Sequence, residues 1–456
     1  MLGADRREEI TVAEDPPPLP LSGAGRALRL ARLPLGVAGR AAVGLGRRMG
    51  GASGESVTAE LRQRTAEEVF AALGELKGGA MKVGQALSVF EAAVPDEMAG
   101  PYREALTRLQ DQAPPMRHSQ LGDVLAESLG EHWRERFREF DEDAAAAASI
   151  GQVHRAVWED GTTVAVKVQY PGAGVALESD LRQLGRISRM IGPLLPGMDL
   201  SPVITELQER MVEELDYRRE AWSQDAFAEA YADDPDVVVP RVLASGPRVV
   251  VSEWLDGVPL NQLIREQDRA GLDRVAERYI SFLLGAPSRV GLLHADPHPG
   301  NFRLTPDGRL GVVDFGAVDR LPEGLPVPMG RLLAVALREE ADTLVDGLRD
   351  EGFIRDAVDI DPVELLAFLE PFVAPCRVDR FSFTRDWLRS VTSEINDPRG
   401  TAFQVSLRLN LPPQYLLIHR VWLGGTAVLA QMGVDVATRA VVDRYLPGID
   451  LPPLAR

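Results

Sequence analysis

The amino-acid sequence predicts an α+β protein with two lobes, a small strand-rich lobe followed by a larger helical lobe, behind a mainly helical extension. Two observations lead to this prediction. Four short β-rich runs lie between residues 150 and 254, and helix-forming sequence dominates before and after them. The chain has 456 residues. A single hydrophobic core usually stops growing at about 250–300 residues, so we expect more than one compact unit.

The overall composition narrows the possible classes of protein. Hydrophobic residues make up 45% and charged residues 26%, as in a soluble globular protein. The net charge of −18 argues against a nucleic-acid partner, because such proteins need a basic surface to neutralise phosphates. The only cysteine, Cys376, excludes an internal disulfide and fits a reducing compartment. We therefore expect no nucleic acid among the partners.

Two further observations concern the location of the protein in the cell. No run of about 18 apolar residues is present, so we expect no transmembrane helix. The N-terminus carries Asp5, Glu8 and Glu9, which is unlike a secretory signal. These features predict a cytoplasmic protein, and the high Ala, Gly and Arg usage suggests a bacterial source.

Residues 1–55 are expected to form a disordered or basic amphipathic arm. Residues 1–22 are polar and then proline-rich, which is typical of disorder. Residues 23–54 contain arginines but no acidic residue, interleaved with apolar residues. One interpretation is peripheral contact with an anionic membrane surface. The other is a flexible arm that folds back on the acidic body, and the sequence leaves both open.

The helical extension is expected over residues 56–135, where good helix formers carry apolar residues at helical spacing. The first lobe is expected over residues 136–258. Its runs Ile150–Val157 and Thr163–Gln169 flank Asp160-Gly161, a dipeptide that favours a tight hairpin turn. The order of elements is therefore a helical segment followed by a β-hairpin.

The remainder of the chain alternates in the same way. Residues 175–231 are predicted to be helical, and Val237–Val242 and Val249–Trp254 are predicted strands. Residues 259–440 are predicted to form a helical second lobe, followed by a short tail over 441–456. Within that lobe, the apolar helix around Tyr415–Met432 is expected to belong to the core rather than to a lipid surface.

A group of polar residues in the second lobe carries the predicted chemistry. The run His294-Ala-Asp296-Pro-His-Pro-Gly-Asn301 precedes Asp314-Phe-Gly by a spacing that suits phosphoryl transfer. Asp296 is the candidate base that orients or deprotonates a hydroxyl or water. Asn301 and Asp314 are the candidate Mg²⁺ ligands, because this ion prefers oxygen. We expect His294 to be scaffold and His298 to orient the loop.

A lysine on a predicted strand of the first lobe complements these groups. Lys167, in Val164-Ala-Val-Lys, is expected to contact the phosphates of ATP and to pair with a glutamate on a helix. Glu214 is the candidate partner, with Glu213 as the second choice. The predicted hinge between the lobes, Glu253, Trp254 and Leu255, is expected to read the adenine edge through its backbone.

The loop expected to cover the phosphates is rich in alanine instead of glycine. The run Ala144–Ala148 precedes Ser149, and alanine leaves less backbone freedom than glycine. The alternative is a low-complexity helix cap. Placement directly before the hairpin favours a phosphate loop. The residues expected to contact the nucleotide here are Ala147, Ala148, Ser149, Ile150, Gly151 and Val153, together with Ala165 on the next strand.

The segment after Asp314-Phe-Gly is short. Arg320-Leu-Pro-Glu-Gly follows almost at once, and neither a long activation segment nor an APE-like stop is present. The sequence therefore shows no platform for a peptide substrate.

Together these motifs resemble the UbiB/AarF family of atypical kinase-like proteins, over roughly residues 60–430. Lys82-Val-Gly84-Gln85 looks like the KxGQ motif of that family, and Glu214-Leu-Asp216 looks like its ExD motif. The resemblance implies a two-lobe protein-kinase-like fold in which the KxGQ extension packs over the active site. It adds Lys82 and Gln85 to the candidate catalytic residues, beside Asp296, Lys167 and Glu214.

The resemblance also implies a function. The expected activity is ATP binding with slow, Mg²⁺-dependent hydrolysis instead of protein phosphorylation, in support of isoprenoid quinone or other membrane-lipid metabolism. The implied partners are ATP and a membrane lipid or quinone precursor. Two alternatives remain open, a small-molecule kinase of the aminoglycoside or choline kinase type and a nucleotide-sensing scaffold without catalysis.

Overall fold

The computed structural model describes residues 116–454, except for 149, 175–199 and 398. The chain divides into two compact units, Met1–Glu68 and Val69–Arg456, and every described residue lies in the second. The basic arm and the predicted extension up to residue 115 are therefore outside the described residues. So are three candidate site residues, Lys82, Gln85 and Ser149.

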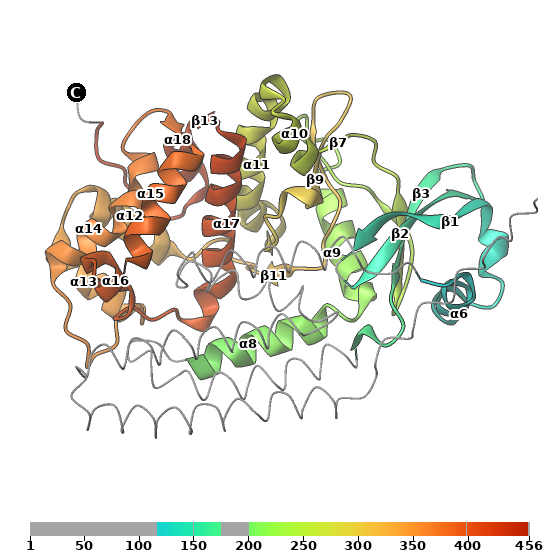
Figure 1. Ribbon diagram of the computed structural model, residues 1–456, viewed down its shortest axis with the longest axis horizontal. Coiled ribbons are helices and arrows are strands. Elements are labelled where there is room, and N and C mark those ends of the chain that lie inside the picture. The colour runs from blue at the N-terminus through green and yellow to red at the C-terminus, as the bar shows by residue number, and fades with distance from the viewer. Residues whose placement is uncertain (1–115, 149, 175–199, 398, 455–456) are drawn as a thin grey trace, which may run out of the picture. The chain divides into compact units, whose positions relative to one another are not determined.

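The first lobe is built on a five-stranded antiparallel sheet with the strand order β1-β2-β3-β6-β5. Figure 1 shows the end of this lobe that carries β1, β2, β3 and α6 (His118–Leu129). Gly161 lies at the tight turn between β2 and β3 with a φ of 98°, a value that suits glycine. The Asp160-Gly161 turn is thus confirmed. The strands are β1 (Phe137–Ala148), β2 (Gly151–Trp158), β3 (Thr163–Gln169), β5 (Val242–Gly246) and β6 (Val249–Glu253).

Helices cover both faces of this sheet, and the alternation along β3 decides which residue meets which helix. Val164, Val166 and Val168 are fully buried on the face that carries α6. The other face carries Lys167, and α9 (Tyr217–Ala230) packs against it through Tyr217. A further helix, α8 (Leu200–Glu213), precedes α9.

The second lobe is mainly helical around one large core. Two helices dominate that core, α11 (Arg269–Val290) and α17 (Leu416–Met432). The predicted core helix around Tyr415–Met432 is confirmed, since α17 buries its apolar residues there. The other helices are α10 (Leu260–Glu266), α12 (Val327–Leu337), α13 (Ala341–Asp350), α14 (Pro362–Val373), α15 (Arg385–Asn396), α16 (Thr401–Ser406) and α18 (Thr438–Tyr445).

Short strands line the junction between the lobes and carry the catalytic segments. One sheet has the order β4-β10-β9-β7, and β8 pairs with β11 in another. Their bounds are β4 (Val237–Val238), β7 (Val258–Pro259), β8 (Leu292–His294), β9 (Phe302–Leu304), β10 (Leu310–Val312) and β11 (Val318–Arg320), with β12 (Phe381–Ser382) and β13 (Asp435–Val436) apart.

Two local predictions need correction. The single strand predicted over Val237–Val242 is wrong, because the run divides between β4 and β5 and joins two different sheets. Pro240 lies in the break, where its missing N–H cannot support a ladder. The alternative of a helix cap at Ala144–Ala148 is also wrong, because these alanines form the end of β1.

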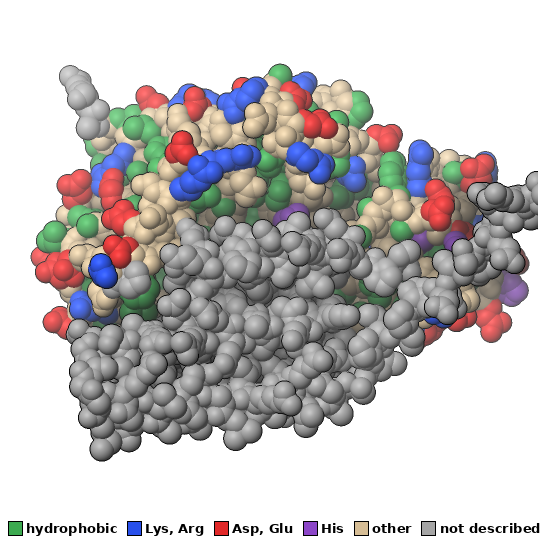
Figure 2. All heavy atoms as spheres, in the orientation of Figure 1, with side chains coloured by type: hydrophobic (Ala, Val, Ile, Leu, Met, Phe, Trp, Pro, Cys, Tyr) green, Lys and Arg blue, Asp and Glu red, His purple; other side chains and the backbone are tan. Residues whose placement is uncertain are grey.

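The exposed surface carries charge of both signs. In the face shown in Figure 2, basic and acidic side chains of the described residues are interspersed. Among the described residues, no helix combines the length and apolar character needed to cross a membrane.

Candidate active site

Lys167 contacts two carboxylates, one in its own lobe and one in the second lobe. Its Nζ lies 2.5 Å from Glu220 Oε1 on α9 and 3.1 Å from Asp314 Oδ2 after β10. The side chains of Lys167 and Glu220 are only 15% and 5% exposed. Burial disfavours the charged amine, but the Asp314 and Glu220 carboxylates outweigh it and raise the pKa of Lys167 well above its usual value. The lysine is therefore a fixed cation.

The predicted partner of Lys167 is wrong. Glu214 and Glu213 lie where α8 ends and the chain turns, whereas Glu220 lies one turn into α9. Helix α9 points its buried face at the sheet, and that face includes Glu220. The sequence did contain a signal, because Glu220 is the acidic residue in the helical spacing of Tyr217, Ala221 and Gln224.

Asp314 is held in place by its neighbours. Its Oδ1 accepts a hydrogen bond from Gly316 N at 2.9 Å, while its backbone carbonyl accepts one from His294 Nε2 at 2.6 Å. The next residue, Phe315, is buried and packs on the rings of His294 and Phe227. These contacts fix the start of the Asp-Phe-Gly segment against the core.

The two histidines of the catalytic loop have the structural roles that we expected. His294 is fully buried among aromatic rings, and burial lowers its pKa, so the neutral ring donates through Nε2. His298 Nδ1 accepts a hydrogen bond from Gly300 N at 3.1 Å and caps the 3₁₀ turn Pro299–Asn301. Tyr279 supports the same loop by donating to the carbonyl of Pro297 at 2.6 Å.

Asp296 is contacted by two side chains from different elements. Asn301 Nδ2 donates to Asp296 Oδ2 at 2.8 Å. Arg420 Nη2, from α17, lies 2.8 Å from Asp296 Oδ1, and both side chains of this ion pair are less than one-fifth exposed. Sequence reasoning missed Arg420, because 124 residues separate it from Asp296 and it interrupts an apolar helix without a motif.

Asn301 and Asp314 fit the requirements of Mg²⁺. Because Asn301 donates through Nδ2, its Oδ1 is left for another partner, and Asp314 supplies a carboxylate. The described residues contain no group of three or more His, Cys, Asp or Glu able to hold a metal alone. Mg²⁺ is usually held by one or two protein oxygens together with phosphates and water, and Asn301 and Asp314 could supply the protein oxygens.

The alanine loop is an extension of the β1–β2 hairpin. Ala147 pairs with Gln152, and Ala148 pairs with Gly151. A Cβ on Gly151 would lie 2.2 Å from the carbonyl oxygen of Val168, so only glycine allows β2 to approach β3 here. The exposed alanines are therefore held by a part of the hairpin, at Gly151, that cannot move without disturbing the sheet.

A buried hydrogen-bond chain supports the same loop. Gln152 Oε1 accepts from Met116 N, its Nε2 meets His154 Nε2 at 2.8 Å, and His154 Nδ1 meets the carbonyl of Asp141 at 2.9 Å. Because the Asp141 carbonyl only accepts, His154 donates through Nδ1 and accepts from Gln152. Burial lowers the pKa of His154, which favours this neutral form.

Several predicted nucleotide-contacting residues share one face of the first lobe. Val153 pairs with Lys167 across β2 and β3, and Ala165 lies two residues from Lys167 on the same face. Ile150 differs, since its side chain is buried against Tyr217 in a core cluster. Its side chain supports the loop and does not line a nucleotide surface.

The hinge offers a backbone donor. Glu253 N and Trp254 N are bonded to the carbonyls of Arg241 and Thr163. Leu255 N makes no hydrogen bond with the described residues. The side chain of Leu255 packs tightly on Gly311, because a Cβ added to Gly311 would lie 2.4 Å from Leu255 Cδ2. Leu255 is therefore the hinge residue best able to bind the adenine edge through its backbone.

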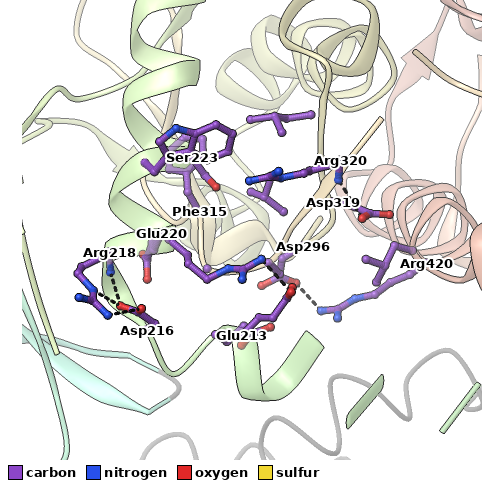
Figure 3. Close-up of a pocket in the computed structure, with 18 of the residues that line it drawn as sticks. Glu213, Asp216, Arg218, Glu220, Ser223, Asp296, Phe315, Asp319, Arg320 and Arg420 are labelled. Atoms are coloured by element: carbon purple, nitrogen blue, oxygen red, sulfur yellow. Dashed lines mark hydrogen bonds and ion pairs between the residues drawn. The ribbon is translucent and has the colours of Figure 1, made fainter. Parts of the chain in front are cut away.

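A pocket of about 640 Å³ opens beside Asp296 (Figure 3). Phe315, Leu416 and Leu417 contribute apolar walls. Acidic and basic side chains are mixed in the lining: Glu213, Glu214, Asp216, Glu220, Asp296 and Asp319 with Arg218, Arg219, Arg320 and Arg420. Neither Lys167 nor Asp314 lines the pocket, so Asp296 marks its border with the predicted nucleotide site.

Comparison with known proteins agrees with this geometry. A family model described as the ABC1 atypical kinase-like domain matches residues 108–346. The uncharacterized protein slr1919 of Synechocystis is 34% identical over 309 residues, which cover 66% of this chain and 54% of that protein. Atypical kinase COQ8, mitochondrial, of Schizosaccharomyces pombe is 28% identical over 412 residues, covering 88% and 65%.

A solved structure is also similar, the complex of Rv3197 with erythromycin from Mycobacterium tuberculosis. It shares 43% identity, has a TM-score of 0.65 and covers 88% of this chain and 100% of that chain. By contrast, the chain spans only about half of slr1919 and under two thirds of COQ8. The matched region exceeds half of the sequence, so the chain belongs to the ABC1 atypical kinase-like family, the UbiB/AarF family that its motifs predict.

Proposed function

We propose that this protein binds ATP with Mg²⁺ and hydrolyses it slowly in support of isoprenoid quinone or other membrane-lipid metabolism. One observation supports the ATP-dependent part above all others. Lys167 of the first lobe meets Asp314 of the second at 3.1 Å while Glu220 fixes it from α9. This is the arrangement that an ATP-phosphate contact requires, because it places a fixed cation beside a candidate metal ligand.

Each candidate site residue has a separate role in the proposed reaction. Leu255 N binds the adenine edge, and Lys167 contacts the phosphates beneath the alanine loop. Asn301 and Asp314 would hold Mg²⁺, which supplies neutralisation of phosphate charge when bound. Asp296 accepts the proton of the attacking water. The water oxygen forms a bond to the γ-phosphorus while the bond from that phosphorus to the bridging oxygen of ADP breaks, and the products are ADP, phosphate and a proton.

The lipid part of the proposal is supported mainly by the family. Relatives carry the name COQ8 and the location mitochondrial, and the family resemblance implies work on quinone precursors. The basic arm over residues 23–54 offers a route to an anionic membrane, although it lies outside the described residues.

The alternative of a small-molecule kinase is less well supported by the pocket. Such an enzyme with a cationic acceptor needs an acidic pocket, but basic residues neutralise much of this lining. Asp216 is paired with Arg218, Glu213 with Arg219 and Asp296 with Arg420. A non-catalytic scaffold is disfavoured because the described candidate residues Lys167, Asp296, Asn301 and Asp314 converge.

Macrolide binding is a second candidate function, favoured by one observation. The Mycobacterium tuberculosis relative is a complex with erythromycin, and the similarity covers 88% of this chain. Isothermal titration of the purified protein with erythromycin, with and without Mg²⁺-ATP, tests the idea. Absence of heat at ligand concentrations up to the solubility limit would reject it.

The deciding experiment is ATP hydrolysis by the purified protein in Mg²⁺ buffer, with and without anionic liposomes. Asp314→Asn serves as the catalytic control, since it removes a ligand charge with little change of shape. We expect hydrolysis that rises with liposomes and is lost in the variant. Nucleotide binding without hydrolysis in either condition would move the function to a nucleotide-sensing scaffold.

A further inference from the structure

The two oxygens of the Asp296 carboxylate face different parts of the site. Oδ2 accepts from Asn301, which belongs to the candidate metal-binding pair. Oδ1 pairs with Arg420, which lines the pocket, as Figure 3 shows. A group that passes from ATP to a nucleophile near Asp296 therefore comes within reach of Arg420.

Helix α17 holds Arg420 firmly at this place. Gly424 lies one turn further along α17, on the same face as Arg420. A Cβ on Gly424 would lie 2.5 Å from Pro297 Cγ, so the helix backbone packs directly on the catalytic loop. Gly425 is likewise close to Leu283 of α11. Close packing at these glycines fixes the distance between α17 and Asp296.

Arg420 has hydrogen-bonding capacity that Asp296 does not use. Its hydrogen bond to Asp296 comes from Nη2, and within the described part of the chain it has no other partner. A guanidinium presents its donors in a planar fork, so one edge can hold a carboxylate while the other holds an oxyanion. With the side chain 13% exposed and lining the pocket, the remaining donors are left for a ligand on that side.

Other cations near the pocket are already engaged. Lys167 is bound by Glu220 and Asp314. The remaining arginines of the described lining have partners of their own: Arg218 with Asp216, Arg219 with Glu213, and Arg320 with the ring of Trp222. Of the described cations that line the pocket, Arg420 is thus the one placed on Asp296.

We propose that Arg420 is a further catalytic residue, which holds the γ-phosphoryl group of ATP from the pocket side of Asp296 during transfer. This inference rests on the proposed ATP-dependent function and adds a residue and a phosphate subsite to it. Charge in phosphoryl transfer spreads over the equatorial oxygens, where an arginine supplied by the same chain stabilises it. Arg420 exchanges no proton. The bond to ADP breaks, the bond to the water oxygen forms, and the proton of that water goes to Asp296 and then to solvent.

Affinities for ATP and ADP test the phosphate contact without requiring turnover. Arg420→Gln should weaken Mg²⁺-ATP binding by about ten-fold or more, the usual effect of losing a hydrogen bond to a charged group. ADP lacks the γ-phosphate, so its affinity should stay within about two-fold, and it reports that the variant is folded. Arg389→Gln, which removes an exposed arginine of α15 paired with Asp386, is the matched control and should change neither affinity.

A second background separates a phosphate contact from mere positioning of Asp296. If Arg420 only positions Asp296, adding Arg420→Gln to the Asp296→Asn protein should not change its affinities for ATP and ADP. If Arg420 contacts the γ-phosphoryl group, the added substitution should reduce the preference for ATP over ADP as much as it does in the unsubstituted protein. Arg420→Lys should recover part of that preference, because it retains a charge but cannot hold both groups. In the otherwise unchanged protein, hydrolysis should fall about 100-fold in Arg420→Gln.

The outcomes are distinguishable. If the unsubstituted protein binds neither ATP nor ADP, the proposed function fails and this inference fails with it. If it binds ATP normally and Arg420→Gln keeps the preference for ATP over ADP, the proposed function stands and Arg420 has no phosphoryl contact. Loss of preference that disappears in the Asp296→Asn background also rejects the inference.

Discussion

Replacement of Glu220 by glutamine tests the central contact of the site. The substitution keeps the shape of the side chain but removes the charge that lies 2.5 Å from Lys167 Nζ. Loss of one partner from a buried ion pair costs about 3–5 kcal/mol of unfolding free energy. Asp314 remains 3.1 Å from the lysine and compensates in part, so we expect about 2–3 kcal/mol.

The same substitution should impair nucleotide chemistry through a separate route. Without Glu220, Lys167 depends on Asp314 alone, and that carboxylate is a candidate metal ligand. We therefore expect weaker Mg²⁺-ATP binding and a fall in hydrolysis of about 100-fold, the usual scale of a misplaced catalytic group. Urea unfolding and steady-state hydrolysis, measured on the same preparation, separate the two effects.

Two variants complete the experiment. Glu229→Gln lies on the exposed part of the same helix and should change stability by no more than about 0.5 kcal/mol. Glu214→Gln tests the partner of Lys167 that the sequence suggested, and it should not cause the loss of unfolding free energy that we expect for Glu220→Gln. Equal unfolding free energies for Glu220→Gln and Glu229→Gln would refute the reasoning.

Three further predictions follow from close contacts and burial. Gly151→Ala should cost about 1–3 kcal/mol in urea unfolding, because the new Cβ meets the Val168 carbonyl at 2.2 Å, and a neutral result would contradict it. Gly424→Ala should lower hydrolysis despite its better helix propensity, because it forces Pro297 and the catalytic loop away, and an unaltered rate with raised stability would disprove this. Burial lowers the pKa of His294, so below about pH 6.5 the unfolded chain binds a proton that the folded chain does not bind, and the free energy of unfolding should fall. Unfolding measured at pH 7.5 and at pH 5.5 should show a smaller difference in stability for His294→Gln than for the unsubstituted protein.

The sequence predicted those parts of the site that lie within short motifs. The spacing of Asp296, Asn301 and Asp314 is local, and Lys167 lies on a strand whose alternation is visible in the sequence. Such residues can be assigned because each motif places its own side chains on one loop or one strand face.

The parts that could not be predicted depend on packing between distant elements. Glu220 and Glu214 are equally acidic in sequence, and only the turn at the start of α9 decides which one faces the sheet. Arg420 reaches Asp296 because α17 docks on the catalytic loop through Gly424, a contact between segments more than a hundred residues apart. Long-range docking of this kind leaves no local pattern.

The segment after Asp-Phe-Gly bears on the proposal that the acceptor is small. Val318–Arg320 forms β11, which pairs at once with β8, the strand that ends at His294. Leu321 N then bonds to the carbonyl of Gly291, and α12 begins at Val327. The described chain therefore has only a short connection between β11 and α12, where a long activation segment would otherwise lie. Among the described residues, a pocket of about 640 Å³ lies beside Asp296, and we expect it to take water or a compact molecule more readily than a peptide, in line with the proposed hydrolysis.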